Sequence, residues 1–210
     1  MRTALRYSGV WSLPRRRVKR GILLPCLLWA LETDVHAPPR PVEVVVPITL
    51  FTFNRPDEAE WVVVNDGVMG GRSSGFVAVE DGTLRFTGTL VTQGGGFTSV
   101  RARREVDLTG EDGLELRVRG SGRPFEVELD DGVRRFGRTI SRRAPVPTSA
   151  EWTVVRVPFS RLRSSIFGQP VNAPPIDLAH IRSVGLYMLD GRDGPFRVEV
   201  DDVGTYRDSR

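Results

Sequence analysis

From about residue 48 onward, apolar and polar residues alternate in short runs that are separated by turn signals. The clearest case is the segment GLELRVRG (113–120), in which Leu114, Leu116 and Val118 face one way and charged residues face the other. The segment 194–203 repeats this scheme with apolar residues at every second position. A period of two is typical of a β-strand with one face in the core and one face in water.

The same pattern predicts strands over residues 48–53, 61–65, 83–90, 97–103, 113–120, 124–130, 151–159, 183–189 and 194–203. Asp-Gly, a pair favoured in tight hairpins, occurs at 66–67, 81–82, 112–113, 131–132, 190–191 and 193–194. No stretch of a dozen residues has a helical period, and the best short helical candidates are residues 57–61 and 158–165. Many antiparallel strands without an internal repeat predict an all-β fold, a β-sandwich or jelly roll rather than a propeller.

We expect three parts: an N-terminal tail over residues 1–47, a single β-sandwich domain over residues 48–206, and a short C-terminal tail over residues 207–210. The first 31 residues contain no acidic residue, and a basic stretch (15–20) is followed by an apolar one (21–31). These proportions are typical of a secretory signal and too short for a transmembrane helix, which needs about 20 apolar residues. An anchor, an organelle transit peptide and a start site assigned too far upstream stay open as alternatives.

Localisation depends on these alternatives and is unknown. We expect a cytoplasmic or membrane-peripheral protein in a prokaryote, with export if residues 1–37 act as a signal. In a eukaryote we expect a mitochondrial one.

Charge is distributed unevenly along the chain. Residues 1–49 carry eight Lys or Arg against three acidic residues, a net charge of +5, whereas the remainder carries 22 Arg against 23 acidic residues, a net charge of −1. A nucleic-acid partner requires a basic stripe on the folded surface. The nearly neutral folded part therefore argues against nucleic acid.

Few residues offer catalytic or metal chemistry. The folded part has no cysteine and one histidine, His180, which we interpret as a partly exposed loop residue rather than a base. Zinc and a catalytic triad are disfavoured on these grounds, and no cofactor is predicted. Calcium stays open, because Asp130–Asp131, Asp190–Asp193 and Asp201–Asp202 offer carboxylates, one of which (in the pair 201–202) should point inward. A carboxylate pair for glycoside hydrolysis is not singled out.

Two glycine-rich stretches, NDGVMGG (65–71) and QGGGFTSV (93–100), lie between predicted strands. Neither has the residues of a phosphate-binding or dinucleotide-binding loop. Glycine allows backbone angles and close approaches that other residues do not, and Asp66 can accept hydrogen bonds from nearby backbone N–H groups. We therefore predict either a rigid corner or a binding loop.

The combination of these loops with FTG (86–88) and with residues 113–125, 151–162 and 183–203 resembles the complex I intermediate-associated protein 30 family. The resemblance covers nearly all of residues 48–206 and departs from the family pattern at Ser121, where an acidic residue is usual. It implies a galactose-binding-domain-like jelly roll, no enzymatic activity, and a chaperone-like role for a membrane-associated respiratory complex, complex I. The matching loop residues that we take as binding candidates are Asn65, Asp66, Met69, Gly70, Gly71, Ser73, Gly95, Gly96, Phe97, Ser99 and Arg101.

The leading hypothesis is thus a non-catalytic domain that binds protein partners such as complex I assembly intermediates, with at most peripheral membrane association. The alternative is a jelly-roll carbohydrate-binding module that stacks sugars on exposed aromatics, for which the candidates are Trp61, Phe97, Trp152, Phe167 and Tyr187. Exposed, coplanar Trp or Tyr side chains at one rim would favour sugar, and buried aromatics together with an exposed apolar patch would favour protein. An enzyme would need a pocket in which carboxylates or His180 converge.

Overall fold

A computed structural model describes residues 46–208 of the chain. These residues belong to a compact unit that spans residues 43–210. Our expectations for the tail fall almost entirely on residues 1–45, which lie outside the described residues. Within residues 46–208, no helix is both long enough and apolar enough to cross a membrane.

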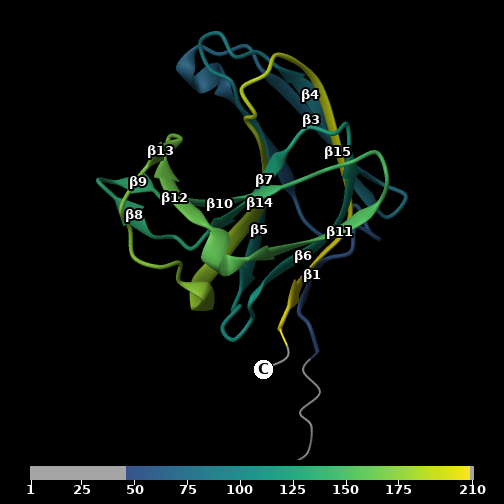
Figure 1. Cartoon of the computed structure of the whole chain (residues 1–210), viewed down its shortest axis with the longest axis vertical. Coiled ribbons are helices and arrows are strands. Elements are labelled where there is room, and N and C mark those ends of the chain that lie inside the picture. Colours follow the sequence, from purple (N-terminus) through teal and green to yellow (C-terminus); the bar gives the residue numbers. More distant parts are fainter. Residues whose placement is uncertain (1–45, 209–210) are drawn as a thin grey trace, which may run out of the picture. The chain divides into compact units, whose positions relative to one another are not determined.

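Two antiparallel sheets make up the fold (Figure 1). The first has the strand order β11-β6-β15-β4-β3, with β1 also paired to β15. Its strands are β1 (Thr49–Phe51), β3 (Ser74–Glu80), β4 (Thr83–Leu90), β6 (Gly113–Gly120), β11 (Thr153–Pro158) and β15 (Gly194–Tyr206).

The second sheet has the strand order β13-β12-β10-β7-β14-β5-β2. Its strands are β2 (Trp61–Asn65), β5 (Thr98–Val106), β7 (Phe125–Asp130), β10 (Ser141–Val146), β12 (Arg163–Ile166), β13 (Gln169–Pro170) and β14 (Ile181–Met188). A separate hairpin of β8 (Arg134–Arg135) and β9 (Arg138–Thr139) lies beside β12 and β13 at the left of Figure 1. Three 3-10 turns complete the chain: η1 (Asp66–Met69), η2 (Phe159–Arg161) and η3 (Leu178–His180).

The core is a single apolar cluster to which both sheets contribute alternate side chains. In β6, Leu114, Leu116 and Val118 are buried, as the period of two predicts, and the charged residues between them keep contact with solvent. The predicted all-β sandwich is therefore confirmed. The helical expectations are wrong in part, because residues 57–61 form no helix and residues 158–165 supply only the single turn η2.

A β-bulge overturns the expectation that Asp201 or Asp202 points inward. The register of β15 against β6 shifts between Val200 and Asp202. The inward positions are thus taken by Val200 and Val203, which are buried, while Asp202 is exposed and Asp201 pairs with Arg117. The extra residue of a bulge places two consecutive side chains on the same, outer side.

Candidate functional site

The carboxylate of Asp66 joins the two glycine-rich loops. Asp66 opens η1 and is fully buried. Its Oδ1 accepts a hydrogen bond from the backbone N–H of Ser73 (2.9 Å), and its Oδ2 accepts from the Ser73 hydroxyl (2.7 Å), from Gly96 N–H (2.6 Å) and from Phe97 N–H (3.3 Å). One side chain thus satisfies backbone donors of both loops, which would otherwise be buried without partners.

The glycines of these loops are required by close approach to Asp66. A Cβ on Gly71 would lie 2.2 Å from Asp66 Cγ, and one on Gly95 would lie 2.3 Å from Asp66 Oδ2. Gly70 ends η1 with φ 85°, in the left-handed region that favours glycine. The conformation of the loops is therefore fixed, and they present the apolar side chain of Met69, which is 53% exposed, to solvent.

The ionised form of Asp66 is favoured in the folded protein. Burial alone raises the pKa of this carboxyl, but the hydrogen bonds from Gly96, Ser73 and Phe97 outweigh burial, so that its pKa lies below its usual value. Asp66 is consequently a structural anion, since all its polar contacts are to the loops that it holds.

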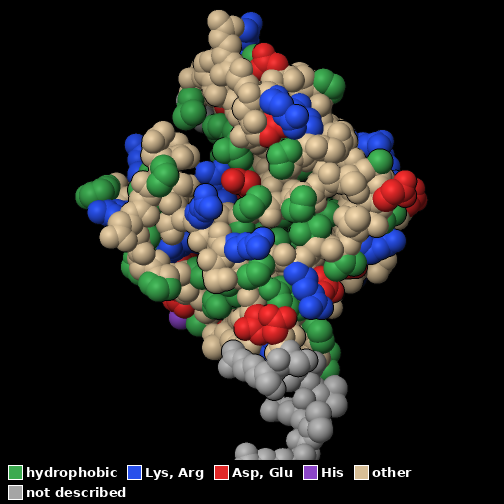
Figure 2. All heavy atoms as spheres, viewed as in Figure 1, with side chains coloured by type: hydrophobic (Ala, Val, Ile, Leu, Met, Phe, Trp, Pro, Cys, Tyr) green, Lys and Arg blue, Asp and Glu red, His purple; other side chains and the backbone are tan. Residues whose placement is uncertain are grey.

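Beside these loops, a groove of about 360 Å³ runs over the outer face of the second sheet. Its floor comes from β5, β7, β14 and β10, which contribute Arg101, Glu128, Tyr187 and Arg143. Met69 and Phe97 belong to one wall. The β8–β9 hairpin and the turn between β12 and β13 form the other wall, and we call these two hairpins together the hairpin lobe (residues 134–139 and 163–170). Figure 2 shows the surface hollowed beside this lobe, with basic and acidic side chains in the hollow.

Tyr187 at the floor of the groove is contacted from both sides of its strand. Phe97 stacks on its ring from the β5 side, at 5.3 Å between centroids, and the guanidinium of Arg143 approaches from the β10 side, at 4.5 Å from the centroid. Burial and the charge of Glu128 raise the pKa of Tyr187, so the phenol stays neutral at physiological pH. The ring is therefore engaged within the protein rather than free to stack on a ligand.

Charged groups at the floor are paired but leave polar atoms without aligned hydrogen bonds. Arg101 Nε lies 3.0 Å from Glu128 Oε2, and Arg143 Nη1 lies 3.0 Å from Glu126 Oε2. These contacts are ion pairs by distance, yet none of the four atoms makes a hydrogen bond of good geometry with another described residue. Glu128 and Arg143 are more than 90% buried, so the floor of the groove consists of paired charges that are largely shielded from solvent.

Comparison with known proteins identifies this architecture. Residues 51–200 match the family model of complex I intermediate-associated protein 30. The chain belongs to this family. Its loop residues Asn65–Arg101 and most of both sheets lie within the matched region.

Curated relatives carry the family name. Complex I intermediate-associated protein 30, mitochondrial, of Mus musculus is 27% identical over 175 residues, which is 72% of this chain and 53% of the mouse protein. The probable Caenorhabditis elegans counterpart is 28% identical over 100 residues, 46% of this chain and 29% of that protein. The chain thus spans about half the length of the mouse relative and less than a third of the length of the Caenorhabditis elegans relative.

Solved structures with a similar fold include carbohydrate-binding modules. The family 11 module of cellulase Lic26A-Cel5E of Clostridium thermocellum has a TM-score of 0.56 at 15% identity. The match covers 78% of this chain and 96% of the module. The family 11 module in complex with a mixed-linked tetrasaccharide has a TM-score of 0.57 at 16% identity. That match covers 77% of this chain and 96% of the module. At such low identity the likeness establishes the jelly-roll fold alone.

The family-matching residues divide into three groups. Asp66, Gly70, Gly71, Ser73, Gly95 and Gly96 build the loop junction. Met69, Phe97 and Arg101 line the groove. Asn65 accepts a hydrogen bond from the Thr98 hydroxyl (2.6 Å), and Ser99 is buried next to β2, where its hydroxyl donates to Val64 O (3.4 Å). At the departure from the family pattern, the Ser121 hydroxyl accepts from Arg197 N–H (3.3 Å).

The aromatic candidates for sugar stacking are mostly covered. Trp61 packs against Phe51 at 4.9 Å between ring centroids. The guanidinium groups of Arg117 and Arg119 in β6 lie 4.9 and 4.7 Å from the ring centroid of Trp152. Phe97 and Tyr187 stack on each other, and of the five candidates only Phe167 is exposed, at 68%. The other four rings are half-buried, so the candidates do not include the exposed, coplanar Trp or Tyr side chains that a sugar site requires, nor the fully buried aromatics expected beside a protein-binding patch.

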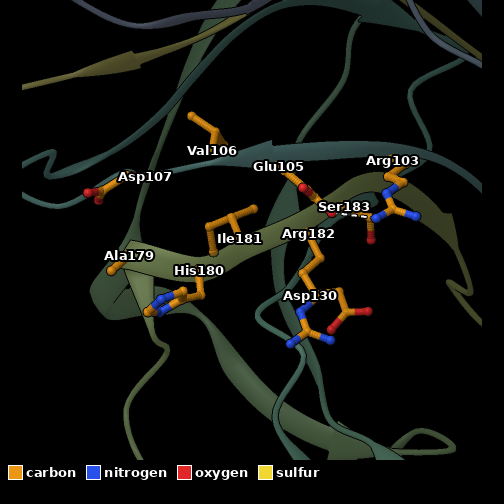
Figure 3. A pocket seen from close by; sticks show the side chains of 10 residues that line it. All are labelled: Arg103, Glu105, Val106, Asp107, Asp130, Ala179, His180, Ile181, Arg182 and Ser183. Carbon is orange, nitrogen blue, oxygen red and sulfur yellow. Dashed lines mark hydrogen bonds and ion pairs between the residues drawn. The ribbon is translucent and has the colours of Figure 1, made fainter.

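A larger cavity of about 860 Å³ contains His180 but does not assemble a catalytic group (Figure 3). Its carboxylates point apart: Glu105 turns to Arg103, and Asp107 lies away from the imidazole. His180 is exposed and its Nδ1 contacts Asp177 Oδ2 at 2.8 Å. Nothing in this cavity positions a nucleophile beside a base.

The carboxylates considered for calcium mostly have basic partners. Asp190 receives two hydrogen bonds from Arg123 (2.9 and 2.6 Å), which hold its pKa at about 2 against the opposing effect of burial. Asp131 pairs with Arg142 at 2.9 Å. Among residues 46–208, no three His, Cys, Asp or Glu side chains converge as a metal site would require.

The sequence singles out Arg101, Tyr187 and Phe167 of this groove, but it does not predict the hairpin lobe as a unit or the roles of Glu128 and Arg143. Glu128, Arg143 and Tyr187 come from strands that are distant in sequence and become neighbours only through the sheet order. A signal was nevertheless present, because outward positions in β7 and β14 alternate with core residues. For Tyr187, the sequence predicts only a candidate role in stacking on a sugar.

Proposed function

We propose that this chain is a non-catalytic assembly factor that holds protein intermediates of complex I, or of a related membrane-associated respiratory complex, in the groove of the second sheet. Membership of the family supports the kind of client. The observation that carries the proposal is the presence of exposed apolar side chains on both walls of the groove, Met69 at 53% and Phe167 at 68%. Clustered exposed apolar side chains with polar neighbours mark protein-interaction sites.

The loop junction gives the groove a rigid wall. Because Asp66 fixes both glycine loops, Met69 and Phe97 are held in place before a partner arrives. Preorganised contacts reduce the entropy that binding must overcome. The family-matching residues therefore act in two ways, some by contact and some by positioning.

A non-catalytic role is supported by the groove's own contacts. Arg101, Arg143 and Tyr187 are held by one another and by acidic neighbours, and no nucleophile lies among the lining residues beside a free base. The named relatives are complex I intermediate-associated proteins, and this name describes attachment to assembly intermediates rather than a reaction. We expect the protein in mitochondria if its source is eukaryotic.

Site-specific photo-crosslinking in native membranes tests the proposal. A photoreactive amino acid replaces Met69 in the full chain, and in the matched control it replaces Phe76, which is 66% exposed on β3 of the other sheet. We expect subunits or assembly factors of the respiratory complex to be crosslinked from position 69 and not from position 76. Equal yields from both positions, or no protein adduct from either, would contradict the proposal. A glycan-binding screen of the same protein then tests the carbohydrate alternative.

A further inference from the structure

Two hairpins in the lobe use the same unusual turn. Residues Phe136 and Gly137 connect β8 to β9, and Phe167 and Gly168 connect β12 to β13. In both loops both residues have positive φ: 51° and 72° in the first, 50° and 76° in the second. Two-residue loops with these angles are type I′ turns, whose first position favours Asn, Asp or Gly.

Phenylalanine is a costly residue at this position. Positive φ brings Cβ of a bulky side chain close to the following carbonyl, a conformation that phenylalanine rarely adopts. Packing does not compensate for it, because Phe136 is 86% exposed and Phe167 is 68% exposed. Strained residues that the fold does not need are a reason to look for function.

Arginines surround both phenylalanines. The guanidinium of Arg135 lies 5.1 Å from the ring centroid of Phe136, and that of Arg138 lies 5.1 Å from the ring of Phe167. Arg134 donates to backbone Gly137 O (2.6 Å) and Arg135 to Asn172 O. Within the described part of the chain, none of these three arginines makes an ion pair, in contrast to Arg101 and Arg143 at the floor. Figure 2 shows apolar side chains beside basic ones over β8 and β9.

We propose that the hairpin lobe binds an acidic, extended segment of the protein partner, in which apolar side chains contact Phe136 and Phe167 and carboxylates pair with Arg134, Arg135 and Arg138. This inference rests on the proposed function and adds the chemistry of the segment that is recognised. Arginine suits the task because its planar guanidinium donates two parallel hydrogen bonds to a carboxylate.

The positive charge of the hairpin lobe favours an acidic partner segment over the chain's own N-terminal tail. The excess positive charge of the lobe requires a negative partner, whereas residues 1–49 carry a net charge of +5. A second copy of the folded part, which carries a net charge of −1 beyond residue 49, offers little complementarity. An acidic partner segment is the occupant that satisfies both the arginines and the apolar tips.

The first measurement reads the chemistry of the segment directly. Photoreactive benzoylphenylalanine replaces Phe136 in the full chain, and the partner residues attached to it in native membranes are mapped by mass spectrometry. We expect a protein segment with net negative charge and interspersed apolar residues. A neutral or basic segment, or a lipid adduct that indicates membrane contact, overturns the inference. Adducts at position 69 without any at position 136 overturn it as well and leave the proposed function intact, whereas adducts at neither position contradict both.

The second measurement uses a synthetic copy of the mapped segment and binding to the purified full chain. We expect Arg134→Gln with Arg138→Gln, and separately Phe136→Asn with Phe167→Asn, to weaken binding by about tenfold or more. Arg161→Gln on η2, an exposed arginine outside the groove, is the matched control and leaves binding unchanged. A version of the peptide with amides in place of carboxylates should bind like the arginine variants.

Thermal stability separates function from structure. Asparagine tolerates the left-handed turn conformation, so the two Phe→Asn substitutions should leave the melting temperature unchanged or raise it while binding is lost. A lower melting temperature together with unchanged binding would assign the phenylalanines a purely structural role and overturn the inference.

Discussion

At the residue scale, single buried acids determine the conformation of whole loops. Asp66 accepts four hydrogen bonds from Ser73, Gly96 and Phe97, and Asp190 accepts from Arg123 and from Arg192 N–H. In both cases the acid is more than 90% buried and its charge is compensated by donors rather than by solvent. These acids should therefore contribute to stability rather than contact a partner.

Replacing Asp66 by Ala should destabilise the protein by about 3 kcal/mol, because several buried donors lose their acceptor at once. Urea unfolding followed by tryptophan fluorescence measures this change. The control is Asp57→Ala, an acid whose side chain is 80% exposed and whose loss should change the unfolding free energy by less than about 0.5 kcal/mol. If both variants unfold at the same urea concentration, the loop junction has no energetic role.

Asp190 should make stability depend on pH in the acid range. Its pKa is about 2 when folded, against an ordinary value of 3.8. Because the folded pKa is depressed, the stabilisation is present above about pH 4 and is lost as the pH falls toward 2, an amount of about 2 kcal/mol. Asp190→Asn should lower stability at neutral pH and flatten the curve between pH 4 and 2. A variant whose curve stays parallel to the wild type would contradict this assignment.

At the element scale, strands with clean alternation could be predicted from the sequence and strands with an interrupted pattern could not. Strands β2, β4 and β6 have the predicted bounds. Strand β10 is not predicted because one of its inward positions is Arg142, only 2% exposed, and because it contains Pro145. Strand β3 was missed because its pattern is inverted, with Gly75 buried and Phe76 exposed.

Turns, like strands, could be predicted from the sequence only where their residues follow a common pattern. Asp81–Gly82 forms the expected hairpin turn, with φ of 50° and 70°, but Asp66–Gly67 opens η1 instead. Phe-Gly is not among the residue pairs that favour type I′ turns, so the sequence does not predict either turn of the hairpin lobe. The positions of the family loops could be predicted, whereas the groove between them and the lobe depends on the order of strands in the second sheet.

The inward arginine of β10 leads to a prediction about that strand. Arg142 pairs with Asp131 at 2.9 Å and donates to Ser164 Oγ (2.6 Å) and Pro174 O (2.8 Å), so it holds the loop before η3 against the sheet. Arg142→Met leaves the Asp131 charge buried without its partner and should cost about 3–5 kcal/mol. The double variant with Asp131→Asn should recover part of this loss, as measured by chemical unfolding. Equal stability of the single and double variants would mean that the two charges are not coupled.

At the scale of the whole molecule, the apolar core is one cluster between the two sheets, to which loop and turn residues such as Phe53, Leu108 and Phe159 also contribute. The cluster extends from Ile48 to Val203, and β1 closes it by pairing with the end of β15, where Thr205 N–H donates to Ile48 O at 2.9 Å. A chain that begins at Val46 keeps every one of these contacts. We therefore propose that residues 48–206 form one independently folding domain, and we expect a chain of residues 46–210 to unfold in a single cooperative transition.

The free energy of unfolding of this shortened chain should lie within about 1 kcal/mol of that of the full chain, because no described core contact is removed. Calorimetry and urea unfolding of both proteins measure the difference. The control is a chain that begins at Asn54, which lacks β1 together with the buried side chains of Leu50 and Phe51 and should lose several kcal/mol. If the chain beginning at Val46 is as unstable as this control, residues before β1 contribute to the fold and the domain boundary proposed here is wrong.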